Sequence, residues 1–124
     1  MSADQNKQTS EGGYAAFSRG DAEGALSTIS DSVEWVVGGD NALTGVYHGK
    51  DEVGGMWAKL GGRGFSTEPS EFLADGDKVV VRTTWRVGGD ESRAVDVASY
   101  DASGKVAHFE SFGGEDVMDR AFPR

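Results

Sequence analysis

The chain carries few residues that could act as nucleophiles or metal ligands. It contains no cysteine and only two histidines, His48 and His108. The lack of cysteine excludes a thiolate metal site, a disulfide and a cysteine nucleophile. Neither H-E-x-x-H nor H-x-E-x-H occurs, so we expect no metal site. Either histidine could serve as a general base near neutral pH.

Carboxylates and arginines could act together on a water molecule, but only where their side chains converge. Arg93 and Asp96 are three residues apart in a stretch that reads as a β-strand. Side chains three apart on a strand point to opposite faces. A hydrolytic site that needs two carboxylates and an arginine around one water is therefore not predicted.

The size and charge of the chain limit the number of domains and the kinds of partner that we expect. Its 124 residues match one domain, and 21 acidic against 12 basic residues give a formal net charge of −9. Such a surface repels phosphate backbones and anionic membranes, so we expect neither nucleic acid nor a membrane as partner. Residues 1–10 lack the apolar centre of a signal peptide, and we expect a cytoplasmic protein.

The first half of the chain predicts helices around one strand. We expect a disordered tail over residues 1–8 and a domain over 9–124. A short helix ends near Arg19, a second runs from Asp21 as N-cap to Ser30, and a third runs from Lys50 to Gly61. A strand at 33–37 precedes a loop through 45–49. Apolar residues at helical spacing mark the second and third helices: Ala22, Ala25, Leu26 and Ile29, then Val53, Met56, Trp57 and Leu60.

The second half predicts four successive strands, at 65–73, 78–87, 92–100 and 105–112. Turn residues separate them at hairpin spacing, which predicts an antiparallel meander. Pro69 suits an edge strand. Residues 117–122 are expected to form a last helical turn. Alternation along 78–87 places Val81, Thr83 and Trp85 on the concave face, with Arg82 and Arg86 on the other.

Four segments of the chain resemble the nuclear transport factor 2-like superfamily, in its SnoaL-like, polyketide cyclase-like branch. These segments are YAAFSRGD at 14–21, DSVEWVVGGDNALTGVYHGKDEV at 31–53, FLADGDKVVVR at 72–82 and SGKVAHFESF at 103–112. The resemblance implies an α+β fold in which a curved antiparallel sheet wraps around helices to form a cone with an internal pocket. It also implies a homodimer through the outer sheet face. It does not select one activity, because the superfamily hosts several.

The resemblance places Asp96 on the concave face, where the ketosteroid isomerase branch carries a carboxylic acid. An acid among Trp35, Trp57, Trp85 and Phe109 would be costly to ionise, so its pKa should rise and the neutral form could donate a hydrogen bond. Ketosteroid isomerase is the established example of an acid kept neutral in this way, and we extend it to Asp96 by analogy. The alternative is a structural Asp96 bonded to backbone, Ser99 or Thr83.

The isomerase branch also has a base-bearing carboxylate and a helix-one tyrosine, and here the match fails. The aligned positions hold Trp35 and Gly13, with Tyr14 one place away. Glu34 should point away from Trp35, and Asp40 lies on the following loop. A proton shuttle at carbon therefore lacks an evident base.

We expect the pocket to bind a small, largely apolar carbonyl-type molecule, with no cofactor. Cofactor-independent acid/base catalysis of cyclase or isomerase type would use Asp96 as acid and Tyr14 or His48 as helper. The alternative is a non-catalytic ligand-binding or dimeric interaction module. His108 is expected on the outer sheet face. The residues expected to bind the ligand are Phe17, Trp35, Trp57, Val81, Thr83, Trp85, Phe109 and Ser111.

Overall fold

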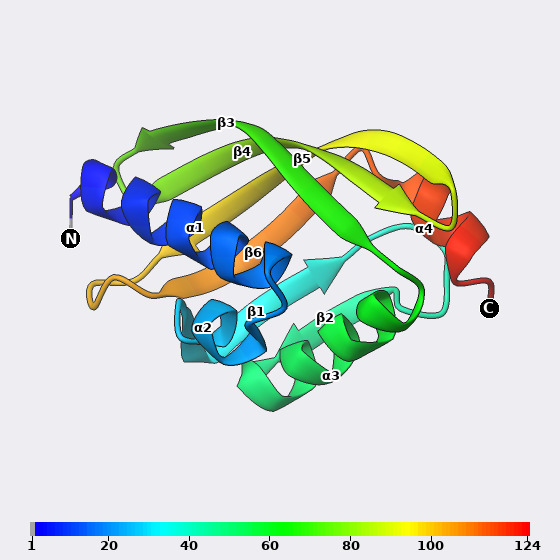
Figure 1. The fold of residues 1–124 in the computed structure, drawn as a ribbon. Coiled ribbons are helices and arrows are strands. Elements are labelled where there is room, and N and C mark those ends of the chain that lie inside the picture. Colours follow the sequence, from blue (N-terminus) through cyan, green and yellow to red (C-terminus); the bar gives the residue numbers. More distant parts are fainter. Residues whose placement is uncertain (1) are drawn as a thin grey trace.

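The computed structural model describes residues 2–124, in which three helices and a short C-terminal helix pack on one curved sheet (Figure 1). The helices are α1 (Ala3–Ser18), α2 (Ala22–Leu26), α3 (Gly49–Gly62) and α4 (Glu115–Ala121). The strands are β1 (Ile29–Val37), β2 (Gly45–His48), β3 (Ser66–Asp75), β4 (Lys78–Val87), β5 (Asp90–Tyr100) and β6 (Val106–Phe112). No helix in residues 2–124 is long and apolar enough to cross a membrane.

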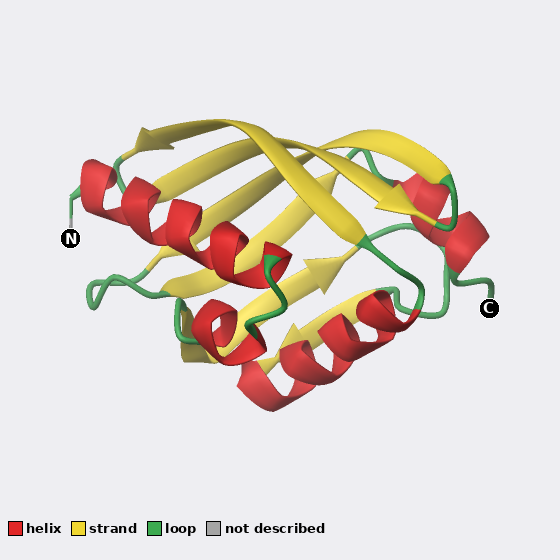
Figure 2. Cartoon of the chain, in the orientation of Figure 1, coloured by secondary structure: helices red, strands yellow, loops and turns green. Residues whose placement is uncertain are grey.

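The six strands form one open sheet in the order β2-β1-β6-β5-β4-β3. The meander predicted for the second half is confirmed, because β3 to β6 pair antiparallel in sequence order. The expectation of a wholly antiparallel sheet is wrong at one place, since β1 pairs parallel with β6. The sheet is therefore mixed, and it curves around the helices on its concave side (Figure 2).

The first helix is longer than the sequence predicted. Residues 3–8 belong to α1 rather than to a loose tail, and residue 1 lies outside the described residues. Ser2 and Gln5 explain the early start, because they form a capping box in which each side chain accepts a hydrogen bond from the other residue's backbone N–H. Asn6 and Ser10 are then buried against the rest of the protein.

Two further element boundaries differ from the prediction. The second helix stops at Leu26, and Ile29 begins β1, where it pairs with Val106. The loop expected through residues 45–49 contains β2, which pairs antiparallel with β1. In both cases strand pairing outweighs the local pattern.

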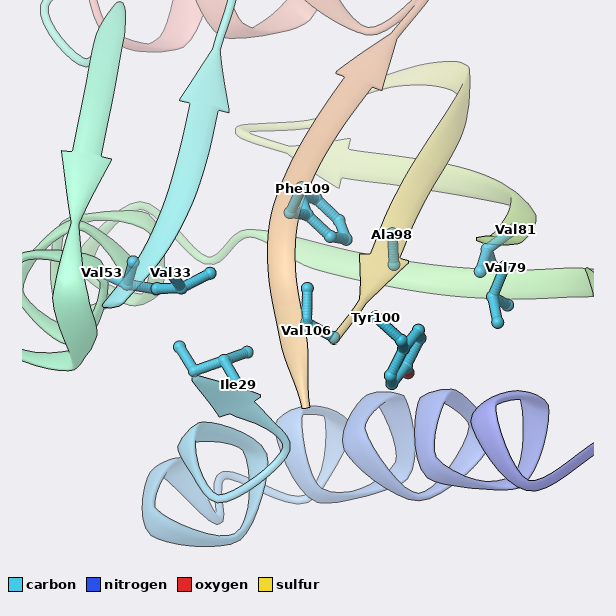
Figure 3. Packing of buried hydrophobic residues seen from close by; sticks show 9 residues of the cluster. All are labelled: Ile29, Val33, Val53, Val79, Val81, Ala98, Tyr100, Val106 and Phe109. Carbon is cyan, nitrogen blue, oxygen red and sulfur yellow. The ribbon is translucent and has the colours of Figure 1, made fainter. Parts of the chain in front are cut away.

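The hydrophobic core consists of two clusters, which meet between the concave face of the sheet and the helices. One cluster joins β1, β4, β5 and β6 to α3, and Figure 3 shows its nine side chains, with Tyr100 and Val79 lying toward α1. The other cluster lies under α3 and α4 and includes Met56, Leu60 and Met118. Trp35 and Trp57 pack against both clusters. These two tryptophans therefore mark the junction of the two clusters.

Candidate functional site

A cavity of about 130 Å³ lies at this junction, between the concave face of the sheet and the helices. All four helices and five of the strands contribute to its wall. Most of the lining is apolar or aromatic, with a few hydroxyl and carboxyl groups among it. Such a site suits a small apolar molecule that carries few polar atoms.

Eight of the residues that line the cavity are aromatic. Trp35 stacks on Phe109, with ring centroids 3.7 Å apart and an interplanar angle of 14°, and Trp57 meets Trp35 edge-on at 5.4 Å. The pairing of Trp35 with Phe109 across β1 and β6 sets this stack. The structure places six of the predicted ligand-binding residues in the wall: Phe17, Trp35, Trp57, Trp85, Phe109 and Ser111.

Two predicted wall residues lie elsewhere. Val81 and Thr83 point to the concave side, as alternation requires, but they are buried in packing contacts and do not line the cavity. The Thr83 hydroxyl is hydrogen-bonded to the Thr67 hydroxyl, and Thr67 is the residue that reaches the cavity. The face of a strand residue was predictable, whereas its distance from the cavity depends on the strands and helices that cover it.

Asp96 is the polar centre of the cavity. Its side chain comes from β5 and is only 3% exposed, and it lines the cavity wall. One carboxyl oxygen accepts a hydrogen bond from the Tyr14 hydroxyl, and the other accepts one from Ser111 Oγ at 2.7 Å. Neither Ser99 nor Thr83, the partners expected from the sequence, is bonded to it. The cross-strand pairing of Asp96 with Ser111 explains the second contact.

Burial changes the acidity of Asp96. Desolvation raises its pKa from 3.8 to about 6, because the charged carboxylate loses water, while the bonds from Tyr14 and Ser111 lower it in part. Burial also raises the pKa of Tyr14, and the neighbouring Asp96 raises it further. Tyr14 therefore stays protonated as a donor. Asp96 exchanges a proton in the range in which many acid/base catalysts work.

The same wall holds a second pair of hydroxyl groups. Ser10 Oγ and the Tyr100 hydroxyl lie 2.5 Å apart, and both residues line the cavity. Ser10 is four residues before Tyr14 on α1, and Tyr100 is four after Asp96 on β5, so each shares a face with its neighbour. Neither residue was predicted from the sequence. If the first helix had been expected to begin well before residue 10, the four-residue spacing from Tyr14 would have indicated Ser10.

The two histidines lie away from the cavity. His108 Nδ1 is 3.1 Å from Glu34 Oε1 on the other face of the sheet, where the sequence placed it. His48 is exposed at the end of β2 and does not line the cavity, contrary to the expectation that it could assist Asp96 in catalysis. Asp40 is also remote, because it is exposed and ion-paired with Arg124. Within residues 2–124, none of these three lines the cavity that holds Asp96.

One further acidic residue lines the cavity and was missed. Glu115, the first residue of α4, contributes to the wall together with Gly38 and Met118. The sequence predicted helix only from residue 117, so it gave no reason to place residue 115. A search for acidic residues just after the last strand would have raised it as a candidate.

The sequence profile of the SnoaL-like domain matches residues 11–111. The chain belongs to the SnoaL-like family. This match covers most of the chain and includes Tyr14, Asp96 and Ser111. Among curated proteins, none matches the chain significantly.

Solved structures place this SnoaL-like protein in the nuclear transport factor 2-like fold. An NTF2-like protein of unknown function from Burkholderia pseudomallei is 28% identical over 100% of both chains, with a TM-score of 0.84. TerC, co-crystallised with polyporic acid, is 25% identical over 94% of this chain and 97% of its own, with a TM-score of 0.82. A proposed polyketide cyclase from Sinorhizobium meliloti shares the fold at 20% identity, 84% and 93% coverage and a TM-score of 0.72.

Proposed function

We propose that this SnoaL-like protein binds a small, largely apolar carbonyl compound in the cavity, with the carbonyl oxygen directed at Asp96 and Tyr14. The observation that carries the proposal is the placement of Asp96: it is a nearly fully buried acid, it faces an aromatic cavity, and it has a tyrosine donor beside it. A similar protein, TerC, was co-crystallised with polyporic acid, which supports a ligand-binding role.

The chemistry proposed at this site is stabilisation of an enol or enolate oxygen. Neutral Asp96 and Tyr14 each carry an O–H group, and both can donate to a carbonyl oxygen. Donors aimed at the oxygen that gains charge stabilise it most strongly where water is excluded. In the structure Tyr14 donates to Asp96. The ligand oxygen would therefore take over that bond on entry.

A second candidate function is binding without catalysis. The groups bonded to Asp96 are the hydroxyls of Tyr14 and Ser111, and neither is a base at neutral pH. By the resemblance to the isomerase branch, Trp35 stands where that branch carries its base, and Trp35 is stacked on Phe109. A carrier or sensor of an aromatic ketone would need no base at this position.

Fluorescence titration separates these functions, because Trp35, Trp57 and Trp85 all line the cavity. We expect aromatic ketones, with polyporic acid included in the panel, to change tryptophan emission with saturation. Each binder is then assayed for product formation with the wild type and with Asp96→Asn. Product that disappears in Asp96→Asn supports catalysis, and binding without product supports the carrier function. No saturable binding by any compound would contradict the proposal.

We further propose that the outer face of the sheet forms a homodimer contact. Val46 and Phe112 expose large side chains, and they alternate along their strands with Tyr47, which packs on the core, and Ser111, which lines the cavity. His108 lies on the same side, beside Glu34. Light scattering should give twice the chain mass, and Phe112→Glu should shift it toward the monomer. A monomer mass for the wild type would rule the contact out.

A further inference from the structure

Glu115 lies at the end of the cavity formed by α4. It lines the wall together with Trp85, Gly38 and Met118, whereas Asp96 lies with Tyr14 and Ser111. Figure 1 shows α4 at the end of the sheet opposite the start of α1. The cavity thus has one acidic group, Asp96, beside α1 and another, Glu115, at the start of α4.

The spacing of these two acids follows from β5. Glu115 Oε2 accepts a hydrogen bond from Gly113 N at 3.0 Å. Gly113 lies directly against the backbone of Arg93, because a β-carbon there would be 3.0 Å from the Arg93 carbonyl oxygen. The same β-carbon would lie 3.7 Å from Ala94 Cα. Ala94 precedes Asp96 by two residues on β5, which corresponds to roughly 7 Å along the strand. A small, extended molecule spans that length.

The loop that follows β1 holds α4 in place. Asp119 Oδ1 accepts hydrogen bonds from Asp40 N and from Asn41 Nδ2, each at 2.9 Å. Ala42 N donates to the Phe122 carbonyl at 2.7 Å, and Asn41 is fully buried. These bonds hold the C-terminal turn of α4, and the hydrogen bond from Gly113 N holds the Glu115 carboxyl group at its start.

One oxygen of Glu115 is free to contact a ligand. Within residues 2–124, the hydrogen bond from Gly113 goes to Oε2, and neither a hydrogen bond to Oε1 nor an ion pair of Glu115 is formed. A carboxylate accepts hydrogen bonds and does not donate them. Its natural counterpart on a ligand is therefore a hydroxyl or a protonated amine. Asp96 differs, because both of its oxygens are already bonded within the protein.

We propose that Glu115 binds a hydrogen-bond donor at the far end of the ligand, so that the ligand class is an elongated aromatic ketone with a hydroxyl or amino group opposite its carbonyl. This inference rests on the proposed function, since it assumes that the carbonyl lies at Asp96. It narrows the ligand from any apolar carbonyl compound to one with two polar ends.

Three related ketones test this assignment: para-hydroxybenzylacetone, benzylacetone and the para-methoxy analogue. They share the carbonyl and the ring and differ in the group at the far end. Isothermal titration calorimetry gives the dissociation constants. We expect the wild type to bind the hydroxyl compound about tenfold more tightly than benzylacetone, as a hydrogen bond to a charged acceptor allows. The methoxy compound, which cannot donate, should lose that preference.

Glu115→Gln should abolish the preference for the hydroxyl compound over benzylacetone. The amide oxygen is expected to take the Gly113 hydrogen bond, which turns the amide NH₂ toward the ligand, and that group donates instead of accepting. Asp116→Asn is the matched control, because it makes the same charge change on an exposed neighbour in α4. It should keep the wild-type preference.

The outcomes separate this inference from the proposed function. Equal affinity of the wild type for all three ketones overturns the role of Glu115 and leaves the cavity as a ketone site. A hydroxyl preference that persists in Glu115→Gln also overturns it, because another group must then bind the hydroxyl. No binding of any of the three, with polyporic acid bound, would also overturn the inference. If polyporic acid and the other aromatic ketones of the panel also fail to bind, both proposals fall.

Discussion

The indole ring of Trp85 lies directly against the α-carbon of Gly114. A β-carbon at residue 114 would overlap Cε3 and Cζ3 of that ring. Gly114 has φ −106° and ψ 9°, a conformation open to other residues, so glycine is needed here for space. The contact joins the wall of the cavity to the start of α4, and thus links the Trp85 ring to the position of Glu115.

Gly114→Ala should therefore disturb both the core and the cavity. The new methyl group forces Trp85 or α4 to move, and overpacking of this kind costs about 1–3 kcal/mol. Urea unfolding followed by tryptophan fluorescence measures the loss. Gly38→Ala serves as the control, because the nearest atom to its β-carbon is 3.9 Å away. Equal stability of the two variants would show that Trp85 adapts freely.

Gly12→Ala and Gly55→Ala should each stabilise the protein. Both glycines lie inside helices, α1 and α3, and a β-carbon at either would meet no atom within 4 Å. Alanine in a helix is more favourable than glycine by roughly 1 kcal/mol. Thermal unfolding should show a higher Tm for both. Gly20→Ala also meets no atom, but its φ of +79° makes it destabilising, so a gain in Gly20→Ala would contradict the argument.

Stability should fall as the pH rises through the titration of Asp96. The folded pKa of about 6 lies above the unfolded value of 3.8, so the folded state binds the proton more tightly between those pH values. The stabilisation of the folded state by protonated Asp96 is fully present below about pH 4 and is lost as the pH rises through about 6. The gap corresponds to roughly 3 kcal/mol.

Asp96→Asn removes this ionisation and should raise the free energy of unfolding at pH 8 by up to about 3 kcal/mol. At pH 4 the gain should vanish. Urea unfolding at the two pH values tests the sign, with the exposed Asp116→Asn as the control. A variant that is less stable than the wild type at pH 8 would count against a destabilising charge at Asp96.

Tyr14→Phe should raise the pKa of Asp96 further. The Tyr14 hydroxyl donates to the carboxylate and lowers its pKa, so removing the hydroxyl favours the neutral acid. Carbon-13 NMR of the Asp96 carboxyl group follows the titration. Ser10→Ala is the control, because Ser10 bonds to Tyr100 and not to Asp96. If Asp96 titrates at the same pH in Tyr14→Phe as in the wild type, the Tyr14 hydroxyl does not stabilise the Asp96 carboxylate.

Local signals were sufficient for the second half of the fold. The turn residues between the strands and the alternation along β4 predicted the meander and the two faces of the sheet. The burial of Val79 and Val81 beside the exposed Arg82 and Arg86 agrees with that alternation. Alternation and turn chemistry act over a few residues, so a single sequence carries them in full.

The sequence was less informative where one segment depends on a distant one. The polar start of α1 gave no apolar pattern, and β2 is visible only through its pairing with β1. Ile29 fits the apolar spacing of α2 and yet belongs to β1, because its pairing with Val106 lies 77 positions away in the numbering. Contacts of this range outweigh local propensity, which is a weak signal for short elements.

By itself the sequence determined the four strands of the meander, the turns between them and the third helix, because each follows from neighbouring residue types. The candidacy of Asp96 came from the resemblance to the superfamily. Only the tertiary structure decided that Tyr14 reaches Asp96 from α1, that Val81 and Thr83 are covered by packing, and that Glu115 lines the other end of the cavity. The physical reason is that a strand or helix period fixes the direction of a side chain, whereas its partner depends on how the elements pack.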